Sequence, residues 1–304
     1  MNALAGAFTT LFIVVTAVFF TQALLPGDRA TIILNTATGD SRVHTPDELA
    51  PINAKYGFDR PLLVQYFDYL TTVARGDLGE SYLMHVPVSD VIWSQGMPTI
   101  ILVGVALGVG WVLALTCVTL TAGRARLTSL LSGTEVVAAS LPQYWLAVVL
   151  LALLAVKIPI FPAAHTSGPA AIVLPALALA IPLAGFIGQA IRARFELVLD
   201  EPFIVTVRTR GSTEIRVRTV HILRHAIQPG LSVAGWSLGG LLSGAVIVEQ
   251  VFSRPGIGST LVSAASARDL PLIGGIIIVI AVAFIIINLT LDLIHTLLDP
   301  RVSP

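Results

Sequence analysis

Long apolar stretches alternate with polar loops along most of this chain, and this pattern predicts membrane-spanning helices. A helix needs about 20 apolar residues to cross the hydrocarbon core of a bilayer. Its backbone polar groups must also be satisfied inside the segment, because lipid offers them no partner. The chain is therefore expected to be an all-α membrane protein with six transmembrane helices, at Leu4–Leu25, Thr99–Thr121, Thr134–Val156, Ala170–Ala190, Leu231–Val251 and Ile273–Leu298.

One long polar segment, residues 26–97, interrupts this pattern between the first two apolar stretches. Inside it, Thr45 followed by Pro46 has the residue types of a helix start. Apolar positions at helical spacing predict a further short helix over 61–74. The chain is thus divided into three expected parts: a first transmembrane helix (1–25), an extracytoplasmic region with short helices (26–97) and a five-helix core with a cytoplasmic loop (98–304, loop 191–229).

The composition agrees with a membrane protein, since 55% of the residues are apolar and only 12% are charged. Soluble domains carry about 25% charged residues. The first apolar stretch is longer than the apolar region of a signal peptide and has no basic residues before it. We therefore expect it to be a retained helix.

The positions of the cationic residues predict the topology. Cytoplasmic loops carry an excess of lysine and arginine. The loops after the second and fourth apolar stretches and the C-terminal tail hold Arg124, Arg126, Arg192, Arg194, Arg208, Arg210, Arg216, Arg218, Arg224 and Arg301. The short loops on the other side hold only Lys157, Arg254 and Arg268. Both termini are therefore expected in the cytoplasm, and residues 26–97 outside.

The loop from 191 to 229 has the residue types of two short helices joined by a turn. Asp200 or Glu201 can cap the first helix, and Pro202 suits its first turn. Gly211 follows at the position where a left-handed residue ends a helix. Ser212 or Thr213 can then cap a second helix, with Glu214 in its first turn and Gln228 at its end.

The first of these short helices is expected to present apolar Phe203, Ile204 and Val207 beside Arg208 and Arg210. An apolar surface flanked by arginines suits a cleft on a soluble partner. An amphipathic helix lying on anionic lipid headgroups has the same composition. From the residues alone, both interpretations stay open.

This loop resembles the cytoplasmic coupling loop of ABC-importer permeases, and in particular of the dipeptide/oligopeptide/nickel branch, as in its peptide-permease B-type subunit. That branch typically reads D-Y-V-R-T-A-R-A-K-G and then H-x-L-R-N-A-L-x-P. The matching residues are Phe203, Thr206, Arg208, Arg210 and Gly211 in the first part, and His221, Leu223, Arg224, Ala226 and Pro229 in the second.

The resemblance continues along nearly the whole chain. The matching segments are Leu25-Pro26-Gly27-Asp28, Gly57-Phe58-Asp59-Arg60-Pro61 with Gln65-Tyr66, Arg75-Gly76-Asp77-Leu78-Gly79, Ser140-Leu141-Pro142-Gln143-Tyr144-Trp145-Leu146, the run from Glu249 to Gly258, and Leu298-Asp299-Pro300-Arg301. The chain departs from the pattern at Pro202, where the family has aspartate, and at Val207 and Thr209, where it has alanine. These bulkier residues alter the docking surface.

The resemblance implies a type I importer permease fold in the cytoplasmic membrane of a prokaryote, with one peripheral helix and a five-helix core. It implies import of di- or oligopeptides or related small solutes. The implied partners are a homologous second permease, two ATPase subunits and an extracytoplasmic solute-binding protein. The implied coupling residues are Glu201, Phe203, Ile204, Thr206, Val207, Arg208, Arg210 and Gly211.

The sequence offers no catalytic site of its own. It has no GxxxxGK[ST] phosphate-binding loop, and its two lysines, Lys55 and Lys157, are both predicted outside. We expect no bound cofactor and no enzymatic activity, with ATP and Mg²⁺ held by partner subunits.

Two sets of polar residues have the residue types of a chemical site. His221 and His225 have metal-ligand spacing but no third ligand and arginine neighbours, so no metal site is expected. Asp292 lies in the last apolar stretch. An acidic residue inside a membrane suggests an alternative function as a proton-coupled secondary transporter.

Overall fold

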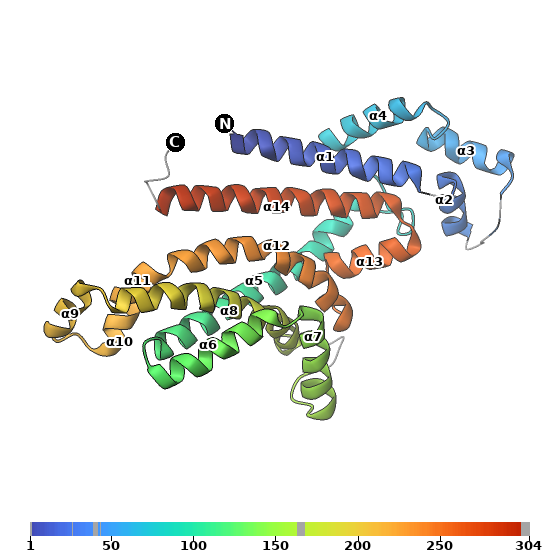
Figure 1. The fold of residues 1–304 in the computed structure, drawn as a ribbon. Coiled ribbons are helices and arrows are strands. Elements are labelled where there is room, and N and C mark those ends of the chain that lie inside the picture. The colour runs from blue at the N-terminus through green and yellow to red at the C-terminus, as the bar shows by residue number, and fades with distance from the viewer. Residues whose placement is uncertain (1, 26, 39–41, 43, 163–167, 299–304) are drawn as a thin grey trace. The chain divides into compact units, whose positions relative to one another are not determined.

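The structure is a computed structural model that describes residues 2–25, 27–38, 42, 44–162 and 168–298. Within these residues the chain is helical, and its only strand-like feature is an isolated bridge between Glu80 and Pro87. Among the described helices, five are long and apolar enough to cross a membrane: α1 (Asn2–Leu24), α5 (Val88–Thr121), α8 (Ala170–Leu199), α12 (Gln228–Val251) and α14 (Leu270–Leu298) (Figure 1).

The third predicted span is not one continuous helix. It consists of α6 (Ala125–Ser140) and α7 (Gln143–Leu151), with a π-helical turn over Ala152–Lys157, and the two parts are bent by 100°. Pro142 has no N–H to donate and forces the preceding residue out of the helical region. Leu141 accordingly has an extended backbone. The expected third span is thus a bent pair of helices rather than one continuous helix, and the described residues contain six candidate spans when that pair counts as one.

The chain forms two compact units. Unit 1 contains residues 1–97 and 259–289, and unit 2 contains residues 98–258 and 290–304. In unit 1, α2 (Arg29–Thr38) and α3 (Pro46–Tyr56) precede α4 (Leu62–Ala74). The predicted helix start at Thr45 is confirmed, because Thr45 is the N-cap of α3 and its N–H donates to Glu48 Oε2 over 2.9 Å. The short helix predicted over 61–74 is confirmed as α4.

Unit 1 has its own small core and a buried polar clamp. Val15 and Val18 of α1 are buried with Ile278 of α14, and side chains of α4 pack against them. Asp269 is 1% exposed and accepts hydrogen bonds from the Ser81 hydroxyl and from the backbone N–H of Tyr82, at 3.2 Å, and of Leu83, at 3.3 Å. A buried carboxylate is stable only when it is bonded in this way. Asp269 therefore ties the segment before α5 to the start of α14.

Unit 2 is built around α8, which packs against α6, α7 and α12. Gly185 allows the close approach of α6 and α8. A Cβ atom at this position would lie 2.5 Å from the backbone nitrogen of Ala139 and 2.6 Å from the Glu135 carbonyl oxygen. Small residues at such crossings let helix backbones come close. The same helix carries the largest share of the core, with Leu179, Ile187, Ile191 and Phe195 fully or almost fully buried.

A second buried acid, Glu249, lies near the end of α12. Its side chain is fully buried and accepts a hydrogen bond from the Thr99 hydroxyl of α5. The same hydroxyl oxygen accepts the backbone N–H of Ile257 over 2.9 Å, at the start of α13 (Ile257–Ala267). One threonine side chain thus connects α5 with both ends of the turn between α12 and α13.

Candidate functional site

The short cytoplasmic helix expected from the sequence is α9 (Pro202–Thr209). Glu201 is its N-cap residue by backbone conformation, and Pro202 occupies the first helical position. The Glu201 side chain makes no cap hydrogen bond, but its carbonyl oxygen accepts the Ile204 N–H over 3.0 Å.

Gly211 follows α9 with φ of +82°, a left-handed conformation. This confirms the predicted turn. A Cβ atom here would meet no other atom within 4 Å, so the demand for glycine comes from the backbone angle alone.

The apolar residues of α9 are distributed between its buried and exposed faces differently from the prediction. Ile204 is completely buried in the core of unit 2, and Val207 packs partly against that core. Phe203 is 39% exposed, and Val205 is 62% exposed. The expectation that Ile204 faces outward is therefore wrong. Residues three apart share one helix face, so Ile204 and Val207 together anchor the helix. Val205, which is not among the residues predicted from the sequence, points outward.

The second predicted helix is divided into shorter pieces. Thr213 caps α10 (Glu214–Arg216) as predicted, with its hydroxyl oxygen accepting the Arg216 N–H over 3.4 Å. A π-helical turn over Val217–Ile222 follows, then α11 (Leu223–Ala226), and Gln228 already belongs to α12. The His225 ring meets the Phe203 ring edge-on, with centroids 5.4 Å apart.

A chain of charged contacts links α9 to a transmembrane helix. Glu214 accepts from Arg208 of α9, at 3.3 Å, and from Arg218 Nε, at 2.9 Å. Arg218 is 6% exposed, and its Nη1 donates to the carbonyl oxygens of Thr119 (3.1 Å) and Ala122 (2.7 Å) at the end of α5. Cations near the last carbonyls of a helix also interact favourably with its dipole. Glu214 and Arg218 thus connect the end of α9 to the end of α5.

The pKa of Glu214 reflects these contacts. Partial burial alone would raise the pKa of this carboxyl. The hydrogen bonds and positive charges of Arg208 and Arg218 outweigh that effect and lower the pKa below its ordinary value.

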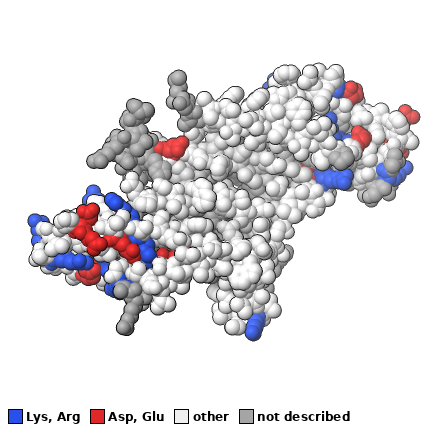
Figure 2. Space-filling model, viewed as in Figure 1, with Lys and Arg blue, Asp and Glu red and all other residues white. Residues whose placement is uncertain are grey.

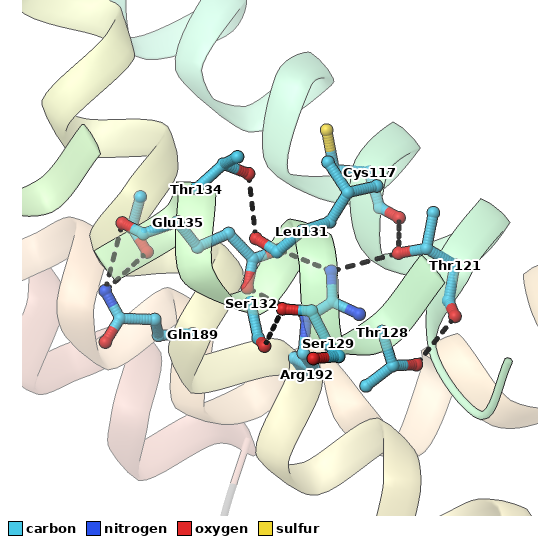
Figure 3. A network of polar contacts seen from close by, with 11 residues as sticks. Cys117, Thr121, Thr128, Ser129, Leu131, Ser132, Thr134, Glu135, Gln189 and Arg192 are labelled. Atoms are coloured by element: carbon cyan, nitrogen blue, oxygen red, sulfur yellow. Dashed lines mark hydrogen bonds and ion pairs between the residues drawn. The ribbon is translucent and has the colours of Figure 1, made fainter. Parts of the chain in front are cut away.

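A second polar network lies inside unit 2, between α5, α6 and α8 (Figure 3). Arg192 donates to both carboxylate oxygens of Glu135, at 2.8 Å and 2.5 Å, and Nη2 also donates to the Thr121 hydroxyl at 3.0 Å. The Arg192 and Glu135 side chains are 5% and 7% exposed. The sequence predicts Arg192 in a cytoplasmic loop, but α8 continues to Leu199 and buries this side chain. An acidic residue in an apolar stretch was the available signal for this pair.

Charge on the visible face of unit 2 gathers over α9 and α10, as Figure 2 shows. The exposed arginines of this part of the chain are Arg208 in α9, Arg210 directly after it, Arg216 in α10 and Arg224 in α11. The helices next to this region present mostly uncharged atoms in the same view. The surface around α9 therefore combines exposed apolar side chains with arginines.

Two family models match this chain, and both describe membrane components of transport systems. Residues 106–304 match the family described as "Binding-protein-dependent transport system inner membrane component", and residues 1–101 match the N-terminal domain model of such membrane components. The chain belongs to this family.

Relatives cover the permease from end to end. A Brucella abortus (strain 2308) protein assigned by name to a peptide transport system, as its permease, is 31% identical over 99% of this chain and 98% of its own length. The glutathione transport system permease protein GsiC of Salmonella typhimurium is 31% identical over 99% of this chain and 97% of its own length. A solved amino acid ABC transporter chain is 20% identical, with a TM-score of 0.47 over 70% of this chain and 95% of that chain.

The permease is therefore a membrane component of a transport system, and its all-α importer-permease fold is confirmed. Family membership favours this function over proton-coupled secondary transport through Asp292, which lies exposed in α14. His221 and His225 gain no third ligand, since no group of three or more possible metal ligands occurs among the residues that the structure describes.

Proposed function

We propose that this permease is a subunit of an ATP-driven importer that moves di- or oligopeptides, or related small solutes, across the cytoplasmic membrane. The names of the peptide and glutathione permeases among its relatives support this substrate class. The segment Glu201–Gly211 receives the movement of an ATPase subunit. The residues in contact are expected to be Phe203, Val205, Thr206, Arg208 and Arg210, with Ile204 and Val207 holding α9 against the core.

The observation that carries this proposal is the division of α9 into an outward and an anchored face. The outward face offers Val205 and Phe203 for an apolar cleft. The anchored face and the Glu214–Arg218 contacts join α9 to the end of α5. A displacement of α9 is therefore passed to a transmembrane helix rather than absorbed by a loose loop.

The other functions of the importer belong to partner subunits. ATP and Mg²⁺ are bound by two ATPase subunits, because the chain has no phosphate-binding loop of its own. A homologous second permease completes the pathway, and an extracytoplasmic protein delivers the solute. Both termini and the 191–229 region lie in the cytoplasm, while residues 26–97 lie outside as a region distinct from the core of 98–304.

The test is a charge placed at Val205. Burying a valine in a partner cleft is worth about 1.5–3 kcal/mol, so Val205→Asp is expected to weaken ATPase association about tenfold or more. The tagged permease is purified in mild detergent from cells that also produce the ATPase subunits, and ATP hydrolysis in the eluate is measured per permease. Val205→Ile, which keeps an apolar side chain, is the matched control.

The outcomes separate docking on a protein from docking on lipid. ATPase activity that copurifies with the wild type and Val205→Ile but not with Val205→Asp supports the proposal. If ATPase activity copurifies with Val205→Asp at the wild-type level, the outward face of α9 does not bind the ATPase, the lipid-facing interpretation is favoured and the coupling assignment is wrong.

A further inference from the structure

Unit 1 contains a cavity that the transport function assigned above does not use. Its volume is about 560 Å³, which lies within the range of about 300–1,000 Å³ typical of small-molecule sites. The walls come from the end of α1, the start of α2, the end of α3 with the turn that follows it, α4, the segment 77–82 and the start of α14. All of these residues belong to one compact unit.

The most distinctive group on this cavity is Arg29. Its Nη2 donates to Gln65 Oε1 over 2.6 Å, and its guanidinium carbon lies 4.3 Å from the centre of the Phe58 ring. Gln65 is itself fixed, because Nε2 donates to the carbonyl oxygens of Phe58 (3.1 Å) and Arg60 (2.8 Å). The arginine is thus held in one orientation by an oriented amide and an aromatic face.

Arg29 retains capacity to bind an anion. A guanidinium has five N–H donors, and the hydrogen bond to Gln65 is the only one that Arg29 donates among the described residues. Desolvation lowers the pKa of this guanidinium, but an arginine remains charged in proteins. A half-buried cation with spare donors fits a carboxylate, which can accept two parallel N–H bonds.

Beside Arg29 the wall is aromatic. Tyr56 stacks on Phe58 with ring centres 5.6 Å apart, and Tyr82 meets Tyr56 edge-on at 5.7 Å. Burial raises the pKa of Tyr82, so its hydroxyl stays protonated and can donate. Aromatic rings arranged in this way provide an apolar surface with a polar rim.

The same cavity also has an acidic side. Asp68, Asp77 and Glu80 line it together with the cations Arg29, Lys55 and Arg60. Asp68 already pairs with Arg60 over 3.2 Å, at the exposed edge. A ligand with one negative and one positive end matches this balance better than a simple anion does.

We infer that this cavity binds a short peptide with a free C-terminal carboxylate, which is held by Arg29 while an apolar or aromatic side chain packs on Tyr56, Phe58 and Tyr82. The acidic side chains face its amino terminus. The inference rests on the proposed function for the class of solute, and it adds a binding site on the permease itself, in the region expected outside the membrane. A solute can then be held by the permease before it enters the pathway.

The test uses the permease–ATPase complex in lipid nanodiscs, without solute-binding protein and without ATP. Binding of radiolabelled glycyl-phenylalanine is measured by equilibrium dialysis and compared with that of its C-terminal amide. Loss of a charge-assisted hydrogen-bonded pair is expected to weaken binding about tenfold or more, so the acid should bind at least tenfold more tightly than the amide. This comparison on the wild type needs no variant.

Two variants locate the site. Arg29→Gln is expected to remove the preference for the acid, whereas Arg42→Gln, at an exposed arginine of the same region that does not line the cavity, is expected to keep it. Equal affinity for acid and amide, no measurable binding, or an unchanged preference in Arg29→Gln would each overturn the inference. ATP-driven uptake with the solute-binding protein is measured separately. Uptake without cavity binding contradicts this inference alone, and absence of uptake contradicts the proposed function.

Discussion

The ion pair between Arg192 and Glu135 makes a quantitative prediction about what stabilises the helix core. The pair is bidentate and is shielded from solvent, with side-chain exposures of 5% and 7%. Removing one partner from such a pair leaves an uncompensated charge and costs about 3–5 kcal/mol. Replacing both partners by apolar residues of similar size is often neutral or stabilising. Single variants should therefore be much less stable than the double variant.

The two single variants are expected to differ. Glu135→Gln leaves the Arg192 guanidinium, which cannot lose its charge in a protein. Arg192→Met leaves a carboxyl that can take up a proton and become neutral. Glu135→Gln should therefore be the more destabilising change at pH 7, by about 3–5 kcal/mol.

The assay is equilibrium unfolding of the purified permease in mixed micelles with increasing dodecyl sulfate, followed by tryptophan fluorescence. The single variant Glu135→Leu and the double variant Arg192→Met/Glu135→Leu complete a cycle with Arg192→Met, and the coupling energy of that cycle isolates the pairwise interaction. Gly133→Ala, on α6 where an added Cβ meets no other atom, serves as a control and should be as stable as the wild type or up to about 1 kcal/mol more stable, because alanine favours a helix more than glycine does. Additive costs for the two single variants, each below about 0.5 kcal/mol, would refute this reasoning.

Two further predictions concern polar contacts at helix ends. Thr99→Val removes both the donor to Glu249 and the acceptor of the Ile257 N–H, so it should destabilise the permease by about 1–3 kcal/mol in the same unfolding assay. Thr99→Ser keeps the hydroxyl and should retain most of the wild-type stability. A valine variant as stable as the wild type would contradict the assigned contacts. Because the pKa of Glu214 is lowered in the folded permease, its contacts contribute their full stability above the ordinary carboxyl pKa of about 4.3. This contribution to stability is lost as the pH falls through the lower pKa of the folded state. Hydrogen exchange of peptides covering Arg208–Arg218, corrected for its intrinsic pH dependence, should stay constant from pH 8 to about 5 and rise below that carboxyl value, whereas Glu214→Gln should show no such pH step.

Local chemistry explains what could be predicted from the sequence. The apolar runs were long enough to define the membrane helices, and the α9 turn depended on residues next to one another. Pro202 begins that helix, and Gly211 ends it with the expected left-handed angle. Such features need no knowledge of distant parts of the chain.

Two of the predictions that the structure corrects have the opposite cause, because each depends on residues far apart in sequence. The charge of Arg192 predicts a loop position, but Glu135, 57 positions earlier, neutralises this charge and lets α8 continue. The pattern around α9 predicts Ile204 at the surface, and only the contacts of Ile204 with the core of unit 2 show that it anchors the helix. The bend at Pro142 was the exception, since its local signal was present and was outweighed by the apolar run around it.

The most direct test of the central claim, that α9 transmits ATPase movement to the membrane helices, uses Gly211. A left-handed angle costs a side-chain-bearing residue about 1–2 kcal/mol. It is least tolerated by β-branched residues and is better tolerated by asparagine. Gly211→Val and Gly211→Asn therefore differ mainly in the free-energy cost of the left-handed backbone angle at this turn, because the site has open space for either side chain.

Both variants are assembled with the ATPase subunits and the solute-binding protein in proteoliposomes, and solute uptake is measured per ATP hydrolysed. The account predicts that Gly211→Val assembles and hydrolyses ATP but loses uptake per ATP by about tenfold or more, equivalent to about 1.4 kcal/mol. Gly211→Asn should stay within a few-fold of the wild type. Wild-type uptake per ATP in Gly211→Val would contradict the claim that this turn carries the coupling.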